Sequence, residues 1–234
     1  MILVRNLRVQ FGSIRPIDDM TVTFRAPVTG LIGPNGAGKT TFLNAVSGFV
    51  RPAAGEILLD DLALNPLSPS RRAALGVRRS FQTAQIVEDL TVAGNIMAAA
   101  DNFTSASRRL DDVRRAMAFT DLGGIANLLA ATLNLFQRRL LDIARALVGT
   151  PRVILLDEPG AGLSETESLF LRDVIAHIPA EFKAQVLLID HDVELIRTLC
   201  AQTVVLDFGH LLAEGPTETV LEREDVRRAY LGEL

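Results

Sequence analysis

Residues 33–40 constrain this chain most, because they read Gly-Pro-Asn-Gly-Ala-Gly-Lys-Thr and match the phosphate-binding pattern G-x-x-x-x-G-K-[ST] in full. The glycines let the backbone bend tightly and turn its N–H groups toward phosphate oxygens. Lys39 supplies a point charge for the β- and γ-phosphates, and the Thr40 hydroxyl is a ligand for Mg²⁺. The loop predicts a site for a nucleoside triphosphate and leaves the reaction open.

The flanking residues supply the strand and the helix that such a loop requires. Residues 28–32 are apolar and β-branched, which is typical of a buried strand. Residues 41–47 have apolar residues at helical spacing, Gly48 is a suitable helix cap, and the helix start adds positive charge to the site. The residues predicted to bind the nucleotide here are Gly33, Pro34, Asn35, Gly36, Ala37, Gly38, Lys39, Thr40 and Thr41.

Composition limits the classes of protein to which this chain can belong. With 234 residues, 48% of them hydrophobic, it can form one large domain or a core with a subdomain. The net charge of −4 argues against broad binding of nucleic acid. Cys200 is alone, which excludes an internal disulfide and fits a reducing compartment. No secretory signal or membrane-spanning apolar run is visible, so we expect a soluble or peripheral chain.

Arginine supplies nearly all of the positive charge and recurs in adjacent pairs. We expect most of these pairs to lie on solvated helix faces, because they do not gather into one basic block. The pairs stand at 71–72, 78–79, 108–109, 114–115, 138–139 and 227–228.

Strand and helix signals alternate through the C-terminal half, which predicts an α/β fold. Residues 153–157 and 186–190 are near-continuous apolar runs, typical of parallel strands that are covered on both faces. Short apolar alternations within residues 1–27, around a turn near 12–13, predict antiparallel strands. A strong helical pattern runs from 137 to 148.

Residues 84–134 differ in kind from the rest of the chain. Segments at 94–100 and 108–120 are rich in Ala, Met and Arg and predict helices, while strand signals fade. We therefore expect one domain over the whole chain. Its P-loop NTPase core, residues 1–83 and 135–234, would have a mostly parallel sheet and an N-terminal antiparallel β part, beside an α-helical subdomain.

Two carboxylates, Asp157 and Glu158, end the apolar run at 153–157. In open α/β sheets, ligands bind beyond the carboxyl ends of the strands. An acidic residue there can hold Mg²⁺, directly or through water, as a Walker B aspartate does. Glu158 would then face the γ-phosphate and polarise an attacking water. The alternative is a strand-end pair without chemistry, and the upstream loop weakens that alternative.

Two further polar residues stand at informative places. His191 follows the run at 186–190, where it could hydrogen-bond the γ-phosphate and sense its loss. Gln82 follows Arg-Arg-Ser-Phe at the border of the helical segment, where its amide oxygen could reach Mg²⁺ or the water. A lone His or Gln at such a place is more often structural.

The order of these parts resembles an ATP-binding cassette (ABC) ATPase, and the resemblance covers essentially the whole chain. It implies ATP and Mg²⁺ as ligands, Glu158 as the catalytic base, His191 as the switch histidine and Gln82 as the Q-loop glutamine. It also implies that Phe11 stacks on adenine, whereas ordinary strand core is the alternative for that ring. The catalytic residues would be Lys39, Gln82, Glu158 and His191, and the metal ligands Thr40, Gln82 and Asp157.

Within this family the chain is similar to the ATPases of branched-chain amino-acid importers. The similar stretches are 31–48, 79–82, 158–163 and 229–233. The likeness implies ATP-driven transport from the cytoplasmic face of a membrane, with permease subunits, a second ABC ATPase subunit and a substrate-binding protein as partners, and no nucleic acid. Related amide, urea and lipopolysaccharide-export ATPases share much of the pattern, so the cargo stays open.

One stretch departs from the family pattern. Where the family has the signature Leu-Ser-Gly-Gly-Gln, residues 133–137 read Leu-Asn-Leu-Phe-Gln. In the family this signature lies at a helix N-terminus and contacts the γ-phosphate held by the other subunit, so small residues are needed. Phe136 puts a ring where glycine is expected, Asn134 replaces the serine, and Gln137 is retained. This favours a heterodimer, in which a partner's signature completes the site over this chain's phosphate loop.

Other functions stay open at the level of sequence. The altered signature suggests a nucleotide-binding regulatory subunit with little hydrolysis. A soluble ABC ATPase acting on nucleic acid or ribosomes would usually carry tandem cassettes or coiled-coil insertions, which this short chain lacks. A P-loop GTPase is disfavoured because no Asn-Lys-x-Asp motif is present.

Overall fold

The apolar runs of the sequence form fully buried strands. All five residues of β3 (Val28–Ile32) and of β7 (Val153–Asp157) are buried, as expected for strands covered on both faces. The computed structural model describes residues 1–81 and 85–231. These residues divide into two compact units, the first built from 1–72 with the chain from 185 onward, and the second from 73–184.

The first unit contains an antiparallel sheet at its N-terminal end. β1 (Ile2–Phe11) and β2 (Ile14–Phe24) form a hairpin, and the strand order is β2-β1-β4-β5. β4 (Ala54–Leu59) and β5 (Leu62–Ala63) complete the sheet. The antiparallel strands predicted around the turn near 12–13 are confirmed.

A second group of strands in the first unit runs in the order β10-β9-β3-β8. β3 is parallel to both β8 (Gln185–Ile189) and β9 (Gln202–Asp207), and β10 (His210–Pro216) is antiparallel to β9. The described helices of this unit are α1 (Lys39–Ser47), α2 (Pro69–Ala74, which ends just past residue 72), α7 (Val193–Leu199), α8 (Thr217–Leu221), α9 (Glu224–Val226) and a π turn (Arg227–Leu231).

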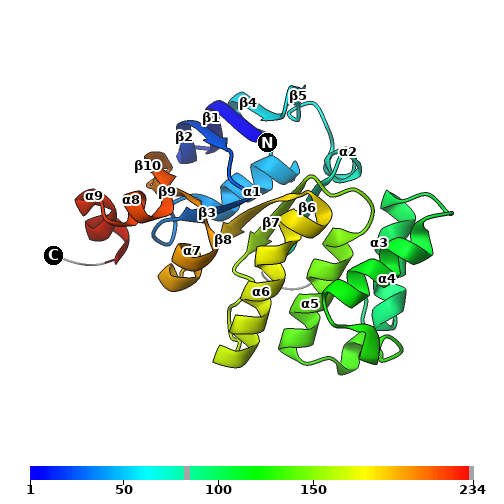
Figure 1. Cartoon of the computed structure of the whole chain (residues 1–234). Coiled ribbons are helices and arrows are strands. Elements are labelled where there is room, and N and C mark those ends of the chain that lie inside the picture. Colours follow the sequence, from blue (N-terminus) through cyan, green and yellow to red (C-terminus); the bar gives the residue numbers. More distant parts are fainter. Residues whose placement is uncertain (82–84, 232–234) are drawn as a thin grey trace. The chain divides into compact units, whose positions relative to one another are not determined.

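The second unit is mostly helical. β6 (Val77–Arg79) pairs in parallel with β7, and α3, α4 and α5 contact one another (Figure 1). Its described helices are α3 (Val92–Phe103), α4 (Arg109–Phe119), α5 (Leu135–Leu147), α6 (Glu165–Phe182) and the 3₁₀ turns Gly123–Ile125 and Ala130–Thr132. The helices predicted at 94–100 and 108–120 are therefore confirmed, whereas a subdomain with the bounds 84–134 stays a prediction.

The predicted fold class is confirmed by these elements. Parallel strands alternate with helices in the core, and the antiparallel sheet stands at the N-terminal end. In the part of the chain that the structure describes, no helix combines the length and apolar character needed to cross a membrane.

We predicted that most of the six arginine pairs are solvated, but three pairs, 71–72, 78–79 and 138–139, each contain a buried arginine. Arg72, Arg78 and Arg139 are buried, at 2%, 4% and 8% exposure. Arg72 donates from Nη1 to the carbonyls of Ala45 (2.5 Å) and Val46 (2.9 Å), so it binds the C-terminal end of α1. Charge pattern alone does not reveal such partners, because they lie far away in the sequence.

Two glycines of the β3–α1 loop allow a matched test of the fold. Gly33 (φ +146°) and Gly36 (φ +82°) are both left-handed, but a Cβ at Gly33 would stand 2.0 Å from the Leu206 carbonyl oxygen, whereas one at Gly36 meets nothing within 4 Å. We expect Gly33→Ala to lower the free energy of unfolding by about 3 kcal/mol or more, and Gly36→Ala by about 1 kcal/mol. Urea unfolding checks both variants, and equal losses would contradict the expectation.

Candidate functional site

The loop between β3 and α1 binds the Lys39 ammonium with its own carbonyl groups. Nζ of Lys39 donates to the carbonyl oxygens of Gly33 (2.7 Å) and Pro34 (3.0 Å). The Ala37 N–H donates to the Pro34 carbonyl at 3.1 Å and closes a turn inside the loop. Among the described residues, no side chain caps the start of α1 at Gly38. An amine and a helix N-terminus therefore bring positive charge to one glycine-rich loop, as a phosphate site requires.

Neighbouring elements of the same unit hold this loop in place. At Gly38 (φ +104°) a Cβ would stand 2.1 Å from the carbonyl oxygen of Pro16 in β2. In the turn between β9 and β10, the Gly209 N–H donates to the Ala37 carbonyl at 3.1 Å. The loop is thus fixed by backbone from two other segments, which leaves its position little freedom.

Of the residues predicted to contact the nucleotide, Gly33, Ala37 and Gly38 are buried, and Phe11 and several others are accessible. Phe11 is the last residue of β1, pairs with Ile14 across the hairpin, and is 52% exposed. It is therefore not the core residue of the alternative interpretation, and its stacking on adenine stays a prediction. Asn35 and Thr40 are exposed, and Thr41 is half-buried.

The second unit places the predicted acidic pair at the end of β7. Asp157 accepts a hydrogen bond at Oδ2 from Nη2 of Arg79 at 3.2 Å, and both side chains are 6% exposed. Glu158 follows in the left-handed region at φ +49°, where a residue with a side chain is strained. Its carbonyl accepts the Ala161 N–H at 3.3 Å, which closes a turn. Such strain clusters at functional sites and so supports a role for Glu158 beyond that of a strand end.

Sequence reasoning missed Arg79 as part of this site. Burial lowers the pKa of Arg79, and the charge of Asp157 and its hydrogen bond raise it again. The guanidinium partly neutralises the buried Asp157 carboxylate. The signal that could have revealed it is an arginine inside a short buried strand, with a second strand ending in aspartate further along the chain.

His191 lies in the first unit, directly after β8, and its side chain is 72% exposed. Its Nδ1 is 3.8 Å from Oδ1 of Asp190, a buried residue whose carboxyl pKa is raised by burial. The Asp192 N–H donates to Asp190 Oδ1 at 3.0 Å, and Oη of Tyr230 donates to the Asp190 carbonyl at 3.3 Å. The imidazole of His191 is therefore accessible, while Asp190 beside it is held by hydrogen bonds from Asp192 and from Tyr230 near the C-terminus.

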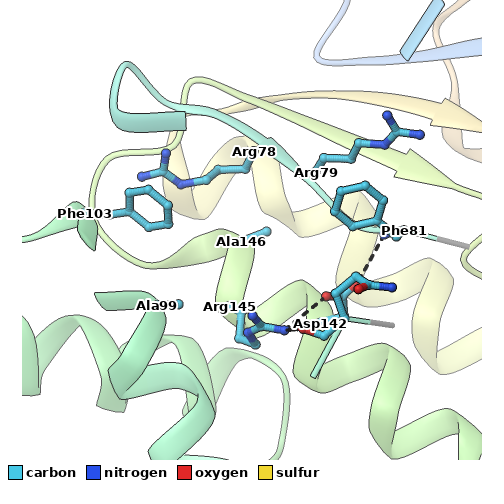
Figure 2. A pocket seen from close by; sticks show the side chains of 9 residues that line it. Arg78, Arg79, Phe81, Ala99, Phe103, Asp142, Arg145 and Ala146 are labelled. Atoms are coloured by element: carbon cyan, nitrogen blue, oxygen red, sulfur yellow. Dashed lines mark hydrogen bonds and ion pairs between the residues drawn. The ribbon is translucent and has the colours of Figure 1, made fainter. Parts of the chain in front are cut away.

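Gln82 lies outside the described residues, so its predicted role stays a prediction. The residue before it, Phe81, donates its backbone N–H to Oδ2 of Asp142 in α5 at 3.2 Å (Figure 2). Burial raises the pKa of Asp142 to about 6, while Arg145, this N–H and Arg139 act to lower it. An ionisable carboxyl that sequence reasoning missed therefore ties α5 to the chain before Gln82.

Residues 133–137, aligned with the family signature, begin α5 and satisfy their own polar groups. Oδ1 of Asn134 accepts the Gln137 N–H at 2.8 Å, and Oε1 of Gln137 accepts the Asn134 N–H at 3.1 Å, which makes a reciprocal capping box. The Phe136 ring packs edge-on against Phe170 of α6, with ring centroids 5.7 Å apart. Two of the three side chains that depart from the family pattern, Asn134 and Phe136, are thus engaged within this chain, and the third, Leu135, is exposed.

The predicted site residues fall into two groups. The first unit carries the loop residues, Phe11 and His191, and the second carries Asp157, Glu158 and the signature residues. Within the described part of the chain, no cluster of three or more His, Cys, Asp or Glu side chains could hold a metal ion. The hydroxyl of Thr40 and the carboxylate of Asp157 are nevertheless oxygen donors of the kind that Mg²⁺ prefers.

Comparisons with known proteins agree with the resemblance to ABC ATPases. A family model described as ABC transporter matches residues 17–161. The chain is 36% identical to the high-affinity branched-chain amino acid transport ATP-binding protein BraF of Pseudomonas aeruginosa, over 98% of this chain and 97% of that protein. It is 34% identical to the lipopolysaccharide export system ATP-binding protein LptB of Escherichia coli, over 98% and 96% of the two chains.

A solved ATP-binding cassette of an ABC transporter, in its ADP conformation, has the same fold. It superposes with a TM-score of 0.87 at 25% identity, covering 100% of this chain and 99% of that one. A glycine-rich phosphate loop that opens a helix after a buried parallel strand defines a P-loop NTPase. The chain belongs to the ABC transporter family, as one of its ATP-binding ATPase subunits.

Burial of Asp142 predicts the direction in which the stability of the fold changes with pH. Its folded pKa of about 6 lies above the ordinary value of 3.8, so the folded state binds the proton more tightly and loses stability as pH rises from 4 through 6. Asp142→Asn should therefore be more stable than wild type at neutral pH, by on the order of 3 kcal/mol, and should lose that advantage in acid. Urea unfolding across this pH range measures it, with the exposed Asp111→Asn as control. An advantage that does not change with pH would refute the assignment.

Proposed function

We propose that this chain hydrolyses ATP to power the import of branched-chain amino acids or related small polar solutes, bound at the cytoplasmic face of the membrane. The observation that carries the hydrolytic part is the Gly33–Thr40 loop, which gathers an ammonium and an uncapped helix start. The full-length similarity to BraF supports the cargo. The similarity to LptB, which is named for lipopolysaccharide export, makes the cargo a point for direct test.

In the proposed reaction, Lys39 and the backbone of the loop neutralise charge on the transferred phosphoryl group. The carbonyls of Gly33 and Pro34 already fix the ammonium on the loop, so little reorganisation is needed when the triphosphate binds. Phosphoryl transfer to water rests on such positioning more than on covalent steps. Phe11, accessible at the end of β1, would stack on the adenine.

Thr40 and Asp157 would hold Mg²⁺, with Gln82 as a further oxygen donor. When bound, the ion would neutralise phosphate charge and orient the γ-phosphoryl group. The exposed hydroxyl of Thr40 is accessible for this role. Arg79, which holds Asp157 Oδ2, would fix the direction in which this carboxylate points.

Glu158 would orient or deprotonate the attacking water, and His191 would hydrogen-bond the γ-phosphate. Glu158 is partly exposed whereas Asp157 before it is buried, which suits different roles for the two acids. The exposed imidazole of His191 suits a contact that is made and lost with the phosphate.

We further propose that the working assembly is a heterodimer of ABC ATPase subunits, joined to permease subunits and a substrate-binding protein. ATP held between two subunits would close the dimer, and hydrolysis would release it. The capping box at Asn134 and the Phe136–Phe170 contact support an asymmetric pair. They leave this chain poorly suited to contact a phosphate that its partner binds.

The same observations favour a second candidate, a regulatory subunit that binds ATP and hydrolyses it slowly. Its phosphate loop would serve as a sensor whose occupancy changes the assembly. Phosphate release measured with and without the partner separates this candidate from the first, because only a hydrolytic subunit contributes turnover when a complete signature is supplied.

Replacing Glu158 by Gln tests the catalytic base. The variant should bind ATP as wild type does, because charge on the phosphate loop is unchanged, while turnover of the assembled complex falls by about 100-fold or more. Calorimetry and phosphate release measure the two effects, with Glu165→Gln as the matched control. Normal turnover of Glu158→Gln would show that Glu158 is not the catalytic base. Leucine uptake that persists in cells after turnover is lost would exclude branched-chain amino acids as the cargo.

Restoring the family signature tests the heterodimer. Wild-type chain alone should hydrolyse ATP slowly, and the triple variant Asn134→Ser, Leu135→Gly, Phe136→Gly should raise that rate by about 10-fold, because backbone N–H groups can then approach phosphate. The single variant Asn134→Ser, which keeps the ring, should stay near the wild-type rate. A triple variant no faster than wild type would show that the signature argument is wrong.

A further inference from the structure

Asp190 lies just after β8, at the edge of the sheet where the phosphate loop begins. β3 and β8 are parallel neighbours, with Gly30 paired to Leu188, so their carboxyl ends lie side by side. The phosphate loop follows β3, and Asp190 and His191 follow β8. Both segments belong to the first unit. The fold therefore places the Asp190–His191 segment beside the loop, at the strand ends where ligands of α/β sheets bind.

The carboxylate of Asp190 is buried and incompletely hydrogen-bonded. Asp190 is 3% exposed. Its Oδ1 accepts the Asp192 N–H at 3.0 Å, whereas Oδ2 is enclosed and has no hydrogen bond among the described residues. Burial raises the pKa of this carboxyl, while the Asp192 N–H and positive charge on His191 act to lower it. A buried carboxylate in this state is stabilised by a positive charge placed next to it.

His191 is the side chain that can supply this charge. Its Nδ1 lies 3.8 Å from Oδ1 of Asp190, within the range of an ion pair but beyond that of a hydrogen bond. Because the His191 side chain is 72% exposed, a small rotation of the ring would bring Nδ1–H onto the carboxylate without displacing packed neighbours. Nε2, on the far side of the ring, would stay available for a second acceptor.

The other ionisable groups near Asp190 come from α7, the C-terminal turn and the phosphate loop. Asp192 caps the start of α7 and Cys200 follows its end, while Oη of Tyr230 donates to the Asp190 carbonyl at 3.3 Å. Burial and the charge of Asp190 raise the pKa of the Cys200 thiol to about 12, so the thiol keeps its proton. Lys39 is bound by two carbonyls of its own loop. Histidine is the side chain whose charge ordinarily changes between about pH 5 and 8.

We propose that Asp190 is a positioning residue that holds His191 as an imidazolium while ATP is bound. The ring would donate from Nδ1 to Oδ1 of Asp190 and from Nε2 to the γ-phosphate. An anion within about 4–6 Å favours the charged form of a histidine, and here two anions act on one ring. Binding of ATP would therefore take up a proton from solvent, and loss of the γ-phosphate would return it. This inference rests on the proposed contact of His191 with the γ-phosphate.

Proton uptake on nucleotide binding is the test, measured by calorimetry at pH 8 in buffers that differ in their enthalpy of ionisation. The full-length chain carries Glu158→Gln throughout as the parent, so that ATP is not consumed. An imidazole in water is largely neutral at this pH, so ATP with Mg²⁺ should take up more than about half a proton. The affinity for ATP should then fall by about 3-fold or more from pH 8 to 9. ADP, which lacks the γ-phosphate, should bind with little proton uptake.

Three variants of this parent locate the proton and the group that holds it. Asp190→Asn keeps an oxygen for the Asp192 N–H and removes only the charge, so it should fold, bind ATP and take up less than half as much proton as the parent. His191→Gln, at an exposed side chain, should take up none. Glu194→Gln, at a side chain that is 70% exposed in the same segment, is the control and should match the parent.

Three results would overturn the inference. One is binding of ATP to the parent without proton uptake, and another is uptake that survives undiminished in Asp190→Asn. The third is uptake that survives in His191→Gln, which would place the proton on Asp190 itself. All three leave ATP binding intact. A failure of the proposed function would differ from them, because the parent would then show no binding of ATP.

Discussion

The first unit depends on a backbone contact that excludes any side chain at Gly33. The Leu206 carbonyl of β9 lies where a Cβ would project, and the Pro16 carbonyl of β2 does the same at Gly38. These contacts place the loop between two strands that are far apart in the sequence. The position of Lys39, and with it the charge offered to phosphate, follows from this packing.

The parts of the fold that sequence predicts are those whose cause is local. β3 and β7 are predictable because five consecutive residues must be buried on both faces, and the loop because its glycines and lysine are adjacent. The interior arginines are not predictable in this way. Arg72 is buried because the carbonyls of Ala45 and Val46 accept its hydrogen bonds, and only the folded chain brings these groups together.

The same distinction applies to the candidate site. Glu158 and His191 are predictable as polar residues that follow buried strands, and the structure places them there. The strained backbone of Glu158 and the contact of Phe136 with Phe170 are not, because both arise from packing. A departure from a family pattern thus becomes interpretable once the neighbours of the substituted residue are known.

The strand pairing has a consequence for how the chain folds during its synthesis. β3 lies between β8 and β9, and the Gln202 side chain accepts the Arg25 N–H at 2.9 Å and donates to the Thr23 carbonyl at 2.8 Å. Residues near 30 must therefore wait for residues near 200, whereas the contiguous stretch 73–184 has its partners close by. On a ribosome β3 would lack both neighbouring strands until residues near 200 had been made, so the phosphate loop that follows β3 would be completed late in synthesis.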